Sequence, residues 1–263
     1  MMPVEQRPPY RSVCEESIAY NRHNWAGANG ALEKVTVMAN IAMLRRVPLL
    51  AILADDELAT LAERMRPRQY RPGTTIFHRD DPGTTLHIIT SGLVKLVLSS
   101  PEGREMTVGI LKAGDFFGEM ALFDGGARSA SAVTLEATET LTLDRAPFVE
   151  TLERHPQVAT ALLGILGDRL RRTDELIQDI LFLDLPGRLA KQLLALADER
   201  GITTAEGIQI DLRLSQSELA AMIGATRESV NRCLGAYADR GVLTLDRDTI
   251  TLHTPETLRA RIY

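Results

Sequence analysis

The sequence has few of the features that mark several protein classes. Its two cysteines, Cys14 and Cys233, are far apart and outside any C-x-x-C pair, which argues against a disulfide framework, a zinc finger or an iron-sulfur site. No apolar run is long enough to cross a bilayer, and the first residues lack a secretory signal's apolar core, so we expect a cytoplasmic protein without membrane insertion. A net charge of -5 argues against DNA binding that ignores sequence, which needs excess lysine and arginine.

The length of 263 residues accommodates two domains, each with its own core. Residues 1–37 are polar without a sustained hydrophobic period, so we expect a disordered or weakly ordered extension. Farther along, short β-branched and leucine-rich runs alternate with glycine-containing turns at intervals of roughly ten residues. This spacing predicts an antiparallel sandwich or barrel. We therefore assign residues 38–146 to a jelly-roll-like β domain.

Residues 147–183 carry a different pattern, in which apolar side chains recur three or four positions apart. A stripe this narrow is typical of a coiled-coil seam between two identical helices. The alternative is one amphipathic helix packed on its own domain, but the narrowness favours a dimer. The stripe consists of Leu162, Leu166, Leu170, Thr173, Ile177 and Ile180. Asp184 is then placed to cap a following helix with Pro186 in its first turn, which predicts a hinge at residues 184–187.

Residues 184–263 contain the pattern of two short helices joined by a tight turn. Ser215 and Glu218 form an S-x-x-E capping box, which starts a helix at Ser215. Gly224 ends this helix, since glycine adopts a left-handed conformation without steric cost, and Thr226 caps the next one. The sequence therefore predicts a helix-turn-helix, and two short alternating strands close the region.

The second of these helices has an apolar face formed by Val230, Cys233 and Tyr237. Its opposite face is charged, and a solvated charged face is the alternative interpretation. Arginine, however, pairs bidentately with guanine, and glutamate accepts a hydrogen bond from the cytosine amino group. We therefore predict that this helix contacts DNA bases. The candidate DNA-binding residues are Ser215, Ser217, Thr226, Arg227, Glu228, Ser229, Asn231 and Arg232.

Three motifs, GDFFGEMALFDGGARSAS, FLDLPGRLA and IGATRESVNR, follow one another along the chain. With them, the chain resembles the cyclic-AMP receptor protein and FNR family of bacterial transcription regulators. The resemblance implies an α+β fold with a jelly-roll-like cyclic-nucleotide-binding β-roll, a long dimerisation helix at 147–183 and a C-terminal winged helix-turn-helix at 184–263. It implies a homodimer that binds palindromic double-stranded DNA with TGTGA-like half-sites and works with RNA polymerase, without catalytic residues, metal or cofactor.

The resemblance also implies where the nucleotide binds. The family's Gly-Glu and Arg-Ser pairs match Gly118, Glu119, Arg128 and Ser129. Glu119 can accept a hydrogen bond from the ribose 2'-hydroxyl, and Arg128 can bind the cyclic phosphate through its guanidinium. The alternative is a Glu119–Arg128 salt bridge that holds a turn.

Three positions of the long helix match family residues that contact the base, namely Arg169, Thr173 and Asp174. The best-known cyclic-AMP receptor has a hydroxyl residue at the position of Asp174. A carboxylate accepts from the adenine amino group, but it suits the paired donors of guanine at least as well. We therefore expect cyclic AMP as the effector, with cyclic GMP or another effector as the alternative.

A metal-dependent jelly-roll enzyme is the competing class. Such enzymes need histidine and acidic ligands that converge on one point. His78 and His87 are single residues in separate predicted strands, without an H-x-H pair. We therefore predict a regulator and not an enzyme.

Overall fold

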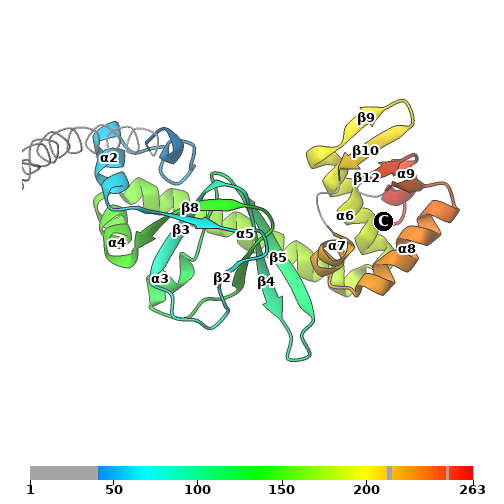
Figure 1. Ribbon diagram of the computed structural model, residues 1–263, viewed down its shortest axis with the longest axis horizontal. Helices are drawn as coiled ribbons and strands as arrows, with labels where there is room; N and C mark the ends of the chain where they lie inside the picture. Colours follow the sequence, from blue (N-terminus) through cyan, green and yellow to red (C-terminus); the bar gives the residue numbers. More distant parts are fainter. Residues whose placement is uncertain (1–40, 212–214, 247–248, 263) are drawn as a thin grey trace, which may run out of the picture. The chain divides into compact units, whose positions relative to one another are not determined.

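The computed structural model describes residues 41–211, 215–246 and 249–262 (Figure 1). The predicted extension at residues 1–37 lies outside these ranges. The chain divides into two compact units, one that ends at Met65 and one that begins at Arg66. Within the described ranges, no helix is both long and apolar enough to cross a membrane.

The first unit contains helix α2, Asp55–Glu63. Three acidic residues occupy its first turn, where the helix dipole favours negative charge. Leu58 and Leu61 are buried on one side, as their helical spacing predicts. This unit ends at Met65, inside the range 38–146 that the sequence assigns to the β domain.

The β-roll consists of two four-stranded antiparallel sheets, which confirms the predicted fold class (Figure 1). Its core contains buried residues of several strands, including Ile89, Val94, Phe117 and Ala132. The first sheet has the order β1 (Arg66–Tyr70), β8 (Thr138–Asp144), β3 (Thr85–Ser91) and β6 (Phe116–Phe117). The second has the order β2 (Thr75–Phe77), β7 (Ser131–Thr134), β4 (Leu93–Ser99) and β5 (Glu105–Lys112).

Strand β1 begins earlier than the β-rich pattern of the sequence indicates. Its residues, RPRQY, are mostly exposed and lack alternation of apolar and polar side chains. The strand lies at the edge of its sheet, where Pro67 needs no ladder partner for its missing N–H. An exposed edge strand has no buried face, and so it leaves no hydrophobic pattern in the sequence.

Three helices follow or interrupt the β-roll: α3 (Met120–Asp124), α4 (Arg145–Arg154) and α5 (Pro156–Phe182). The single helix predicted over 147–183 is therefore two helices, with the break at His155. Proline stands at the start of α5, where its missing N–H costs nothing. The long helix thus begins at Pro156.

The apolar stripe of α5 is exposed along most of its length. Leu163, Leu170 and Ile177, seven residues apart, are 69%, 63% and 49% exposed. Leu162 was predicted to belong to the dimer stripe, but it is 2% exposed and packs within its own chain. The stripe therefore runs through Leu163, and at these three positions its side chains remain exposed among the residues that the structure describes.

The C-terminal domain combines four helices with a small antiparallel sheet around one core. Its helices are α6 (Leu185–Arg200), α7 (Gln216–Met222), α8 (Arg227–Asp239) and α9 (Pro255–Arg259). Its strands, in sheet order, are β11 (Leu243–Asp246), β12 (Thr249–Leu252), β10 (Gly207–Asp211) and β9 (Ile202–Thr204). The two closing strands match the prediction, whereas the β9–β10 hairpin and α9 were not predicted; all three residues of β9 are exposed.

Candidate functional site

The segment that joins β6 to β7 places the predicted nucleotide-binding residues. Gly118 has φ +82°, and a Cβ there would lie 2.4 Å from the Nη1 atom of Arg128. A Cβ at Gly83 would likewise lie 3.1 Å from Arg128 Nε. Glycine at both positions therefore leaves room for the guanidinium in a narrow space.

Arg128 is buried, with 5% exposure, and it forms no ion pair in the described part of the chain. Its Nη1 donates to the carbonyl oxygen of Gly118 at 2.7 Å, and Nη2 donates to the carbonyl oxygen of Thr85 at 2.9 Å. Its Nε has no hydrogen-bond partner there. Burial lowers the pKa of Arg128, and the carboxylates of Glu119 and Asp81 oppose that shift. The guanidinium is thus a buried cation with an unpaired, buried N–H donor, and an anion is the partner that satisfies such a group.

Glu119, which is 3% exposed, pairs with the long helix and not with Arg128. Its Oε1 lies 2.9 Å from Nη1 of Arg169, and Arg169 also donates to the carbonyl oxygen of Phe116. The guanidinium of Arg169 lies 4.7 Å from the centre of the Phe116 ring. The alternative Glu119–Arg128 salt bridge is absent from the structure, and the acidic residue connects the β-roll to α5 instead.

The residues behind Arg128 were missed by sequence reasoning. The Arg128 guanidinium lies 4.2 Å from the Phe77 ring centre, and Thr85 Oγ1 accepts from its Nη2 at 3.2 Å. His87, 6% exposed, stacks on Phe117 with ring centres 4.9 Å apart. Residues two apart on a strand lie on the same face, so strand periodicity was the one signal in the sequence that placed Thr85 and His87 together.

The other predicted nucleotide contacts are exposed. Ser129 donates its hydroxyl hydrogen to the sulfur of Met120 at 3.4 Å. Thr173 donates to the backbone oxygen of Arg169 at 3.0 Å, one turn earlier on α5, and Asp174 is exposed beside it. The structure therefore brings Gly118, Glu119, Arg128 and Arg169 together, while Thr173 and Asp174 lie on the solvent-exposed side of α5.

The predicted helix-turn-helix is present, with each cap formed as expected. The Ser215 hydroxyl accepts from Glu218 N at 3.2 Å, and the Glu218 carboxylate accepts from Ser215 N at 2.6 Å. Gly224 has φ +62° in the turn. The Thr226 hydroxyl then accepts from Ser229 N at 3.3 Å and caps α8. These hydrogen bonds join residues three apart and define where α7 and α8 begin.

The outward face of α8 carries the predicted base-reading side chains. Arg227, Glu228, Asn231 and Arg232 are all exposed, whereas Val230 is fully buried. Hydrogen bonds from its own backbone and from the Thr226 hydroxyl, together with nearby arginines, lower the pKa of Glu228. Its carboxylate is therefore ionised at neutral pH, as an acceptor of a cytosine amino group must be.

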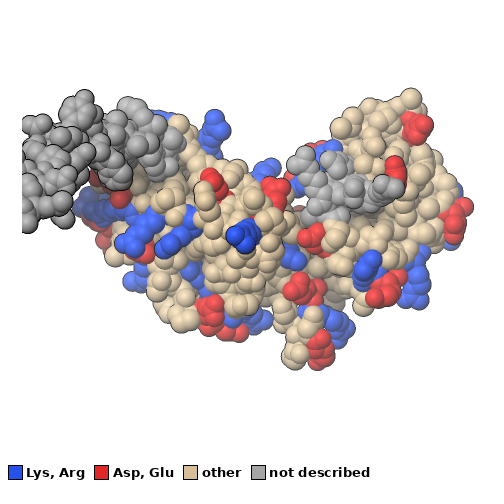
Figure 2. Space-filling model, viewed as in Figure 1, with Lys and Arg blue, Asp and Glu red and all other residues tan. Residues whose placement is uncertain are grey.

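Charge on the C-terminal domain is mixed in sign. Figure 2 shows Lys and Arg interspersed with Asp and Glu on the visible face of this domain. Such a surface does not hold DNA by general attraction.

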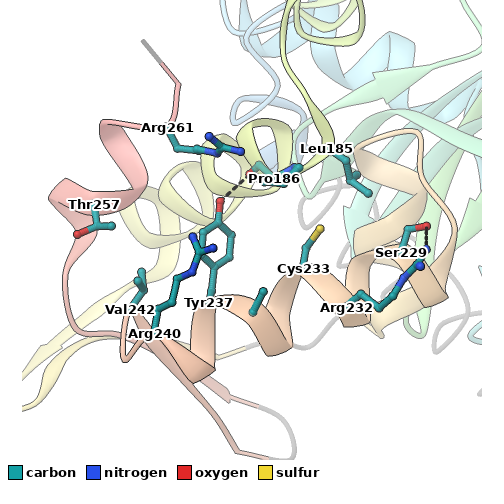
Figure 3. Close-up of a pocket in the computed structure, with 11 residues that line it drawn as sticks. Leu185, Pro186, Ser229, Arg232, Cys233, Tyr237, Arg240, Val242, Thr257 and Arg261 are labelled. Atoms are coloured by element: carbon teal, nitrogen blue, oxygen red, sulfur yellow. Dashed lines mark hydrogen bonds between the residues drawn. The ribbon is translucent and has the colours of Figure 1, made fainter.

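A hollow of about 460 Å³ lies along α8 (Figure 3), and its lining includes two of the predicted DNA-binding residues, Ser229 and Arg232, which are joined by a hydrogen bond from Arg232 Nη2 to Ser229 Oγ at 3.3 Å. Tyr237 closes part of it by donating its hydroxyl hydrogen to the carbonyl oxygen of Pro186 at 2.9 Å. Cys233 lines it and is half-buried, and burial raises the pKa of this thiol. The hollow contains none of the predicted nucleotide-binding residues. In the described ranges, moreover, no three His, Cys, Asp or Glu side chains gather as metal ligands.

Family models match both halves of the second unit. The "cyclic nucleotide-binding domain" model matches residues 67–155, and the "Crp-like helix-turn-helix domain" model matches residues 187–261. Together with the geometry above, they define a class of protein: a transcription regulator with a cyclic-nucleotide-binding domain and a helix-turn-helix that binds DNA.

Curated relatives narrow the class to one family. The chain is 35% identical over 219 residues to the CRP-like cAMP-activated global transcriptional regulator of Mycobacterium tuberculosis, covering 83% of this chain and 98% of the relative. It is 36% identical over 203 residues to the cyclic AMP receptor protein of Thermus thermophilus, covering 77% of this chain and 91% of the relative. The chain belongs to the CRP/FNR family of transcription regulators.

The solved structures agree with this assignment. The c-di-GMP-responsive global regulator CLP of Xanthomonas campestris superposes with a TM-score of 0.69 at 26% identity, over 76% of this chain and 99% of that one. These relatives and domains are those of transcription regulators, so the chain is a regulator and not a jelly-roll enzyme.

Proposed function

We propose that this chain is a homodimeric transcription regulator that binds cyclic AMP in its β-roll and then recognises a palindromic DNA site. The observation that carries the proposal is Arg128, a buried guanidinium with no carboxylate partner and an Nε without an acceptor. A cyclic phosphate is a monoanion with two unesterified oxygens, either of which can accept the hydrogen bond that this unpaired donor lacks. The names of the curated relatives, which are activated by cAMP, point to the same ligand.

The other ligand contacts follow from the geometry around Arg128. The Glu119 carboxylate accepts a hydrogen bond from the ribose 2'-hydroxyl. The Ser129 hydroxyl, Gly118 and nearby backbone N–H groups complete the phosphate site. Because Glu119 also pairs with Arg169 at 2.9 Å, a ligand that engages this carboxylate acts directly on a residue of α5. This contact gives a route from the nucleotide to the helix that joins two copies.

Cyclic GMP is the second candidate ligand, and Asp174 favours it. A carboxylate can accept from the N1–H and the amino group of guanine together, whereas adenine offers it one amino group. The regulator of Xanthomonas campestris responds to c-di-GMP, so this nucleotide is tested as a third ligand. Calorimetric titration of cyclic AMP, cyclic GMP and c-di-GMP into the same protein ranks the three ligands. Cyclic AMP binding most tightly supports the proposal, and either competitor binding most tightly reassigns the effector.

The exposed stripe of α5 supports the homodimer. Leu163, Leu170 and Ile177 recur every seven residues, and Leu166, Thr173 and Ile180 form a parallel series offset by three. This is the heptad spacing by which two helices pack knobs into holes. A dimer also places one α8 on each half-site, as a palindrome requires.

In the DNA complex, Arg227 and Arg232 contact guanines and Glu228 contacts a cytosine of a TGTGA-like half-site, while Ser215, Ser217, Thr226, Ser229 and Asn231 contact backbone or bases. RNA polymerase is the partner that such a regulator acts on.

The DNA proposal is tested by fluorescence anisotropy with a TGTGA palindrome and with a duplex in which both half-sites are scrambled. Cyclic AMP should tighten binding to the palindrome alone, by about tenfold or more. Equal affinity with and without nucleotide would contradict the proposal.

A further inference from the structure

Behind Arg128, the β-roll holds a histidine for which the proposed nucleotide contacts give no role. His87 lies on β3 in antiparallel register with Phe117 of β6 and Thr142 of β8. Its ring stacks on Phe117 and lies 5.8 Å, centre to centre, from Phe77. It is therefore inside the roll, on the same side as the guanidinium that also covers Phe77.

One hydroxyl connects the histidine to the arginine. Thr85 Oγ1 lies 3.3 Å from His87 Nε2 and 3.2 Å from Arg128 Nη2. Arg128 can only donate, so Thr85 accepts from it, and the single hydroxyl hydrogen of Thr85 is free to be donated to a neutral imidazole. Hydrogen-bond donation in this short chain therefore runs from Arg128 through Thr85 to His87.

We infer that His87 is a positioning residue for the nucleotide site: through Thr85 it orients the guanidinium of Arg128, and it takes up a proton from solvent when an anion binds there. This inference rests on the proposed cyclic-nucleotide function. Thr85 holds Nη2 from behind, which leaves Nε of Arg128 for the phosphate. The Nδ1 atom of His87 is also buried without a partner.

The charges around His87 explain the proton uptake. Burial, the Arg128 guanidinium and the Arg68 guanidinium of β1 together lower the pKa of His87 to about 4. The neighbouring strands β6 and β8 present Phe117 and Thr142 to it, which carry no charge. The carboxylates of Glu119 and Asp81 act on Arg128.

An anion beside Arg128 offsets the positive field, so the pKa of His87 rises in the complex while burial keeps it below the ordinary value. A pKa that is higher in the complex than in the free protein means tighter binding as pH falls through the higher value. The protonated imidazole then donates from Nε2, which reverses its hydrogen bond with Thr85.

Calorimetric titration of cyclic AMP into the full chain tests the inference, in buffers of different ionisation enthalpy at about pH 6 and about pH 8. The wild-type protein should take up about 0.2 to 0.5 proton per nucleotide at about pH 6, and close to none at about pH 8. The His87→Gln protein should take up none at either pH. The exposed His78 offers a matched control, and His78→Gln should keep the wild-type uptake.

The positioning role has a separate readout. His87→Phe keeps a ring against Phe117 but removes the acceptor for the Thr85 hydroxyl, and it should weaken cyclic AMP binding several-fold. His87→Gln retains an acceptor and should recover part of this loss. Thr85→Val removes the hydroxyl that accepts from Arg128 while keeping the backbone carbonyl that also accepts from it, and it should weaken binding by about tenfold. Thermal unfolding of each variant separates these effects from loss of the fold.

The outcomes distinguish this inference from the proposed function. Binding of cyclic AMP without proton uptake, or uptake that persists in His87→Gln, would overturn the linkage. His87→Phe binding as tightly as the wild type at about pH 8 would overturn the positioning role. If no cyclic nucleotide binds the wild-type protein at either pH, the proposed function fails as well.

Discussion

The two charged sites of this chain hold their side chains in opposite ways. In the β-roll, Arg128 and Glu119 are 5% and 3% exposed, and backbone carbonyls or another arginine fix them. On α8, Arg227 and Glu228 are exposed. The proposed nucleotide site is already held in place by protein groups, whereas the α8 side chains proposed to contact DNA are exposed. A substitution in the β-roll site should therefore weaken nucleotide binding as a whole. A substitution on α8 should change the base preference at a single position of the DNA site.

Arg128→Ala should give the largest effect. It removes the buried cation and leaves the carbonyl oxygens of Gly118 and Thr85 without their donor, so cyclic AMP affinity should fall by about a hundredfold or more. Calorimetry provides the measurement. Arg79, an exposed residue that follows strand β2, is the matched control. The Arg79→Ala protein should bind cyclic AMP as tightly as the wild type does. Undiminished binding by Arg128→Ala would remove the phosphate assignment.

Leu170→Asp should separate the dimer. Leu170 is 63% exposed at the middle of the α5 stripe, and a carboxylate there would face its symmetry mate across the seam. Sedimentation should give the chain mass of 29.0 kDa for the variant and twice that for the wild type. Gln178→Asp, on an exposed part of the same helix, should leave the dimer intact. A wild-type protein that sediments as a monomer would contradict the seam.

Arg227→Ala should show how an exposed contact behaves. We expect a loss of about 1 to 3 kcal/mol at one base position, with base choice relaxed there and kept elsewhere. Competition binding with half-sites substituted one base at a time measures this pattern. Arg240, exposed just past the other end of α8, is the control. An equal loss on every duplex would instead indicate a phosphate contact.

Asp184→Ala should have the smallest effect. Its carboxylate caps α6 by accepting from Gly187 N at 2.8 Å, and it accepts from Arg261 Nη2 at 2.8 Å. Loss of such a cap lowers the free energy of unfolding by about 1 kcal/mol. Thermal unfolding measures it against Asp198→Ala, an exposed change on the same helix. A wild-type midpoint in the Asp184 variant would show that the cap contributes nothing.

The same contrast explains what the sequence could predict. The α7 and α8 helices were located because their caps use residues three apart, such as Ser215 with Glu218. The β1 strand and the β9 strand were missed because exposed residues leave no hydrophobic period. The helix break at His155 was missed because the apolar spacing continues on both sides of it.

The candidate site was predictable only in part. The resemblance located Glu119, Arg128 and Arg169, but it did not predict that Arg169, 50 residues away on α5, pairs with Glu119. The chain from His87 through Thr85 to Arg128 joins a strand to a loop across 43 residues. No local pattern reports such a pairing, because it depends on how the two sheets close on each other.

The structure of the complex with cyclic AMP tests the central claim most directly. The quantity to measure is the distance from Arg128 Nε to the nearest phosphate oxygen. The account predicts a hydrogen bond of about 2.7 to 3.0 Å, with the ribose hydroxyl on Glu119. A nucleotide bound elsewhere, with Arg128 Nε still lacking an acceptor, would contradict it.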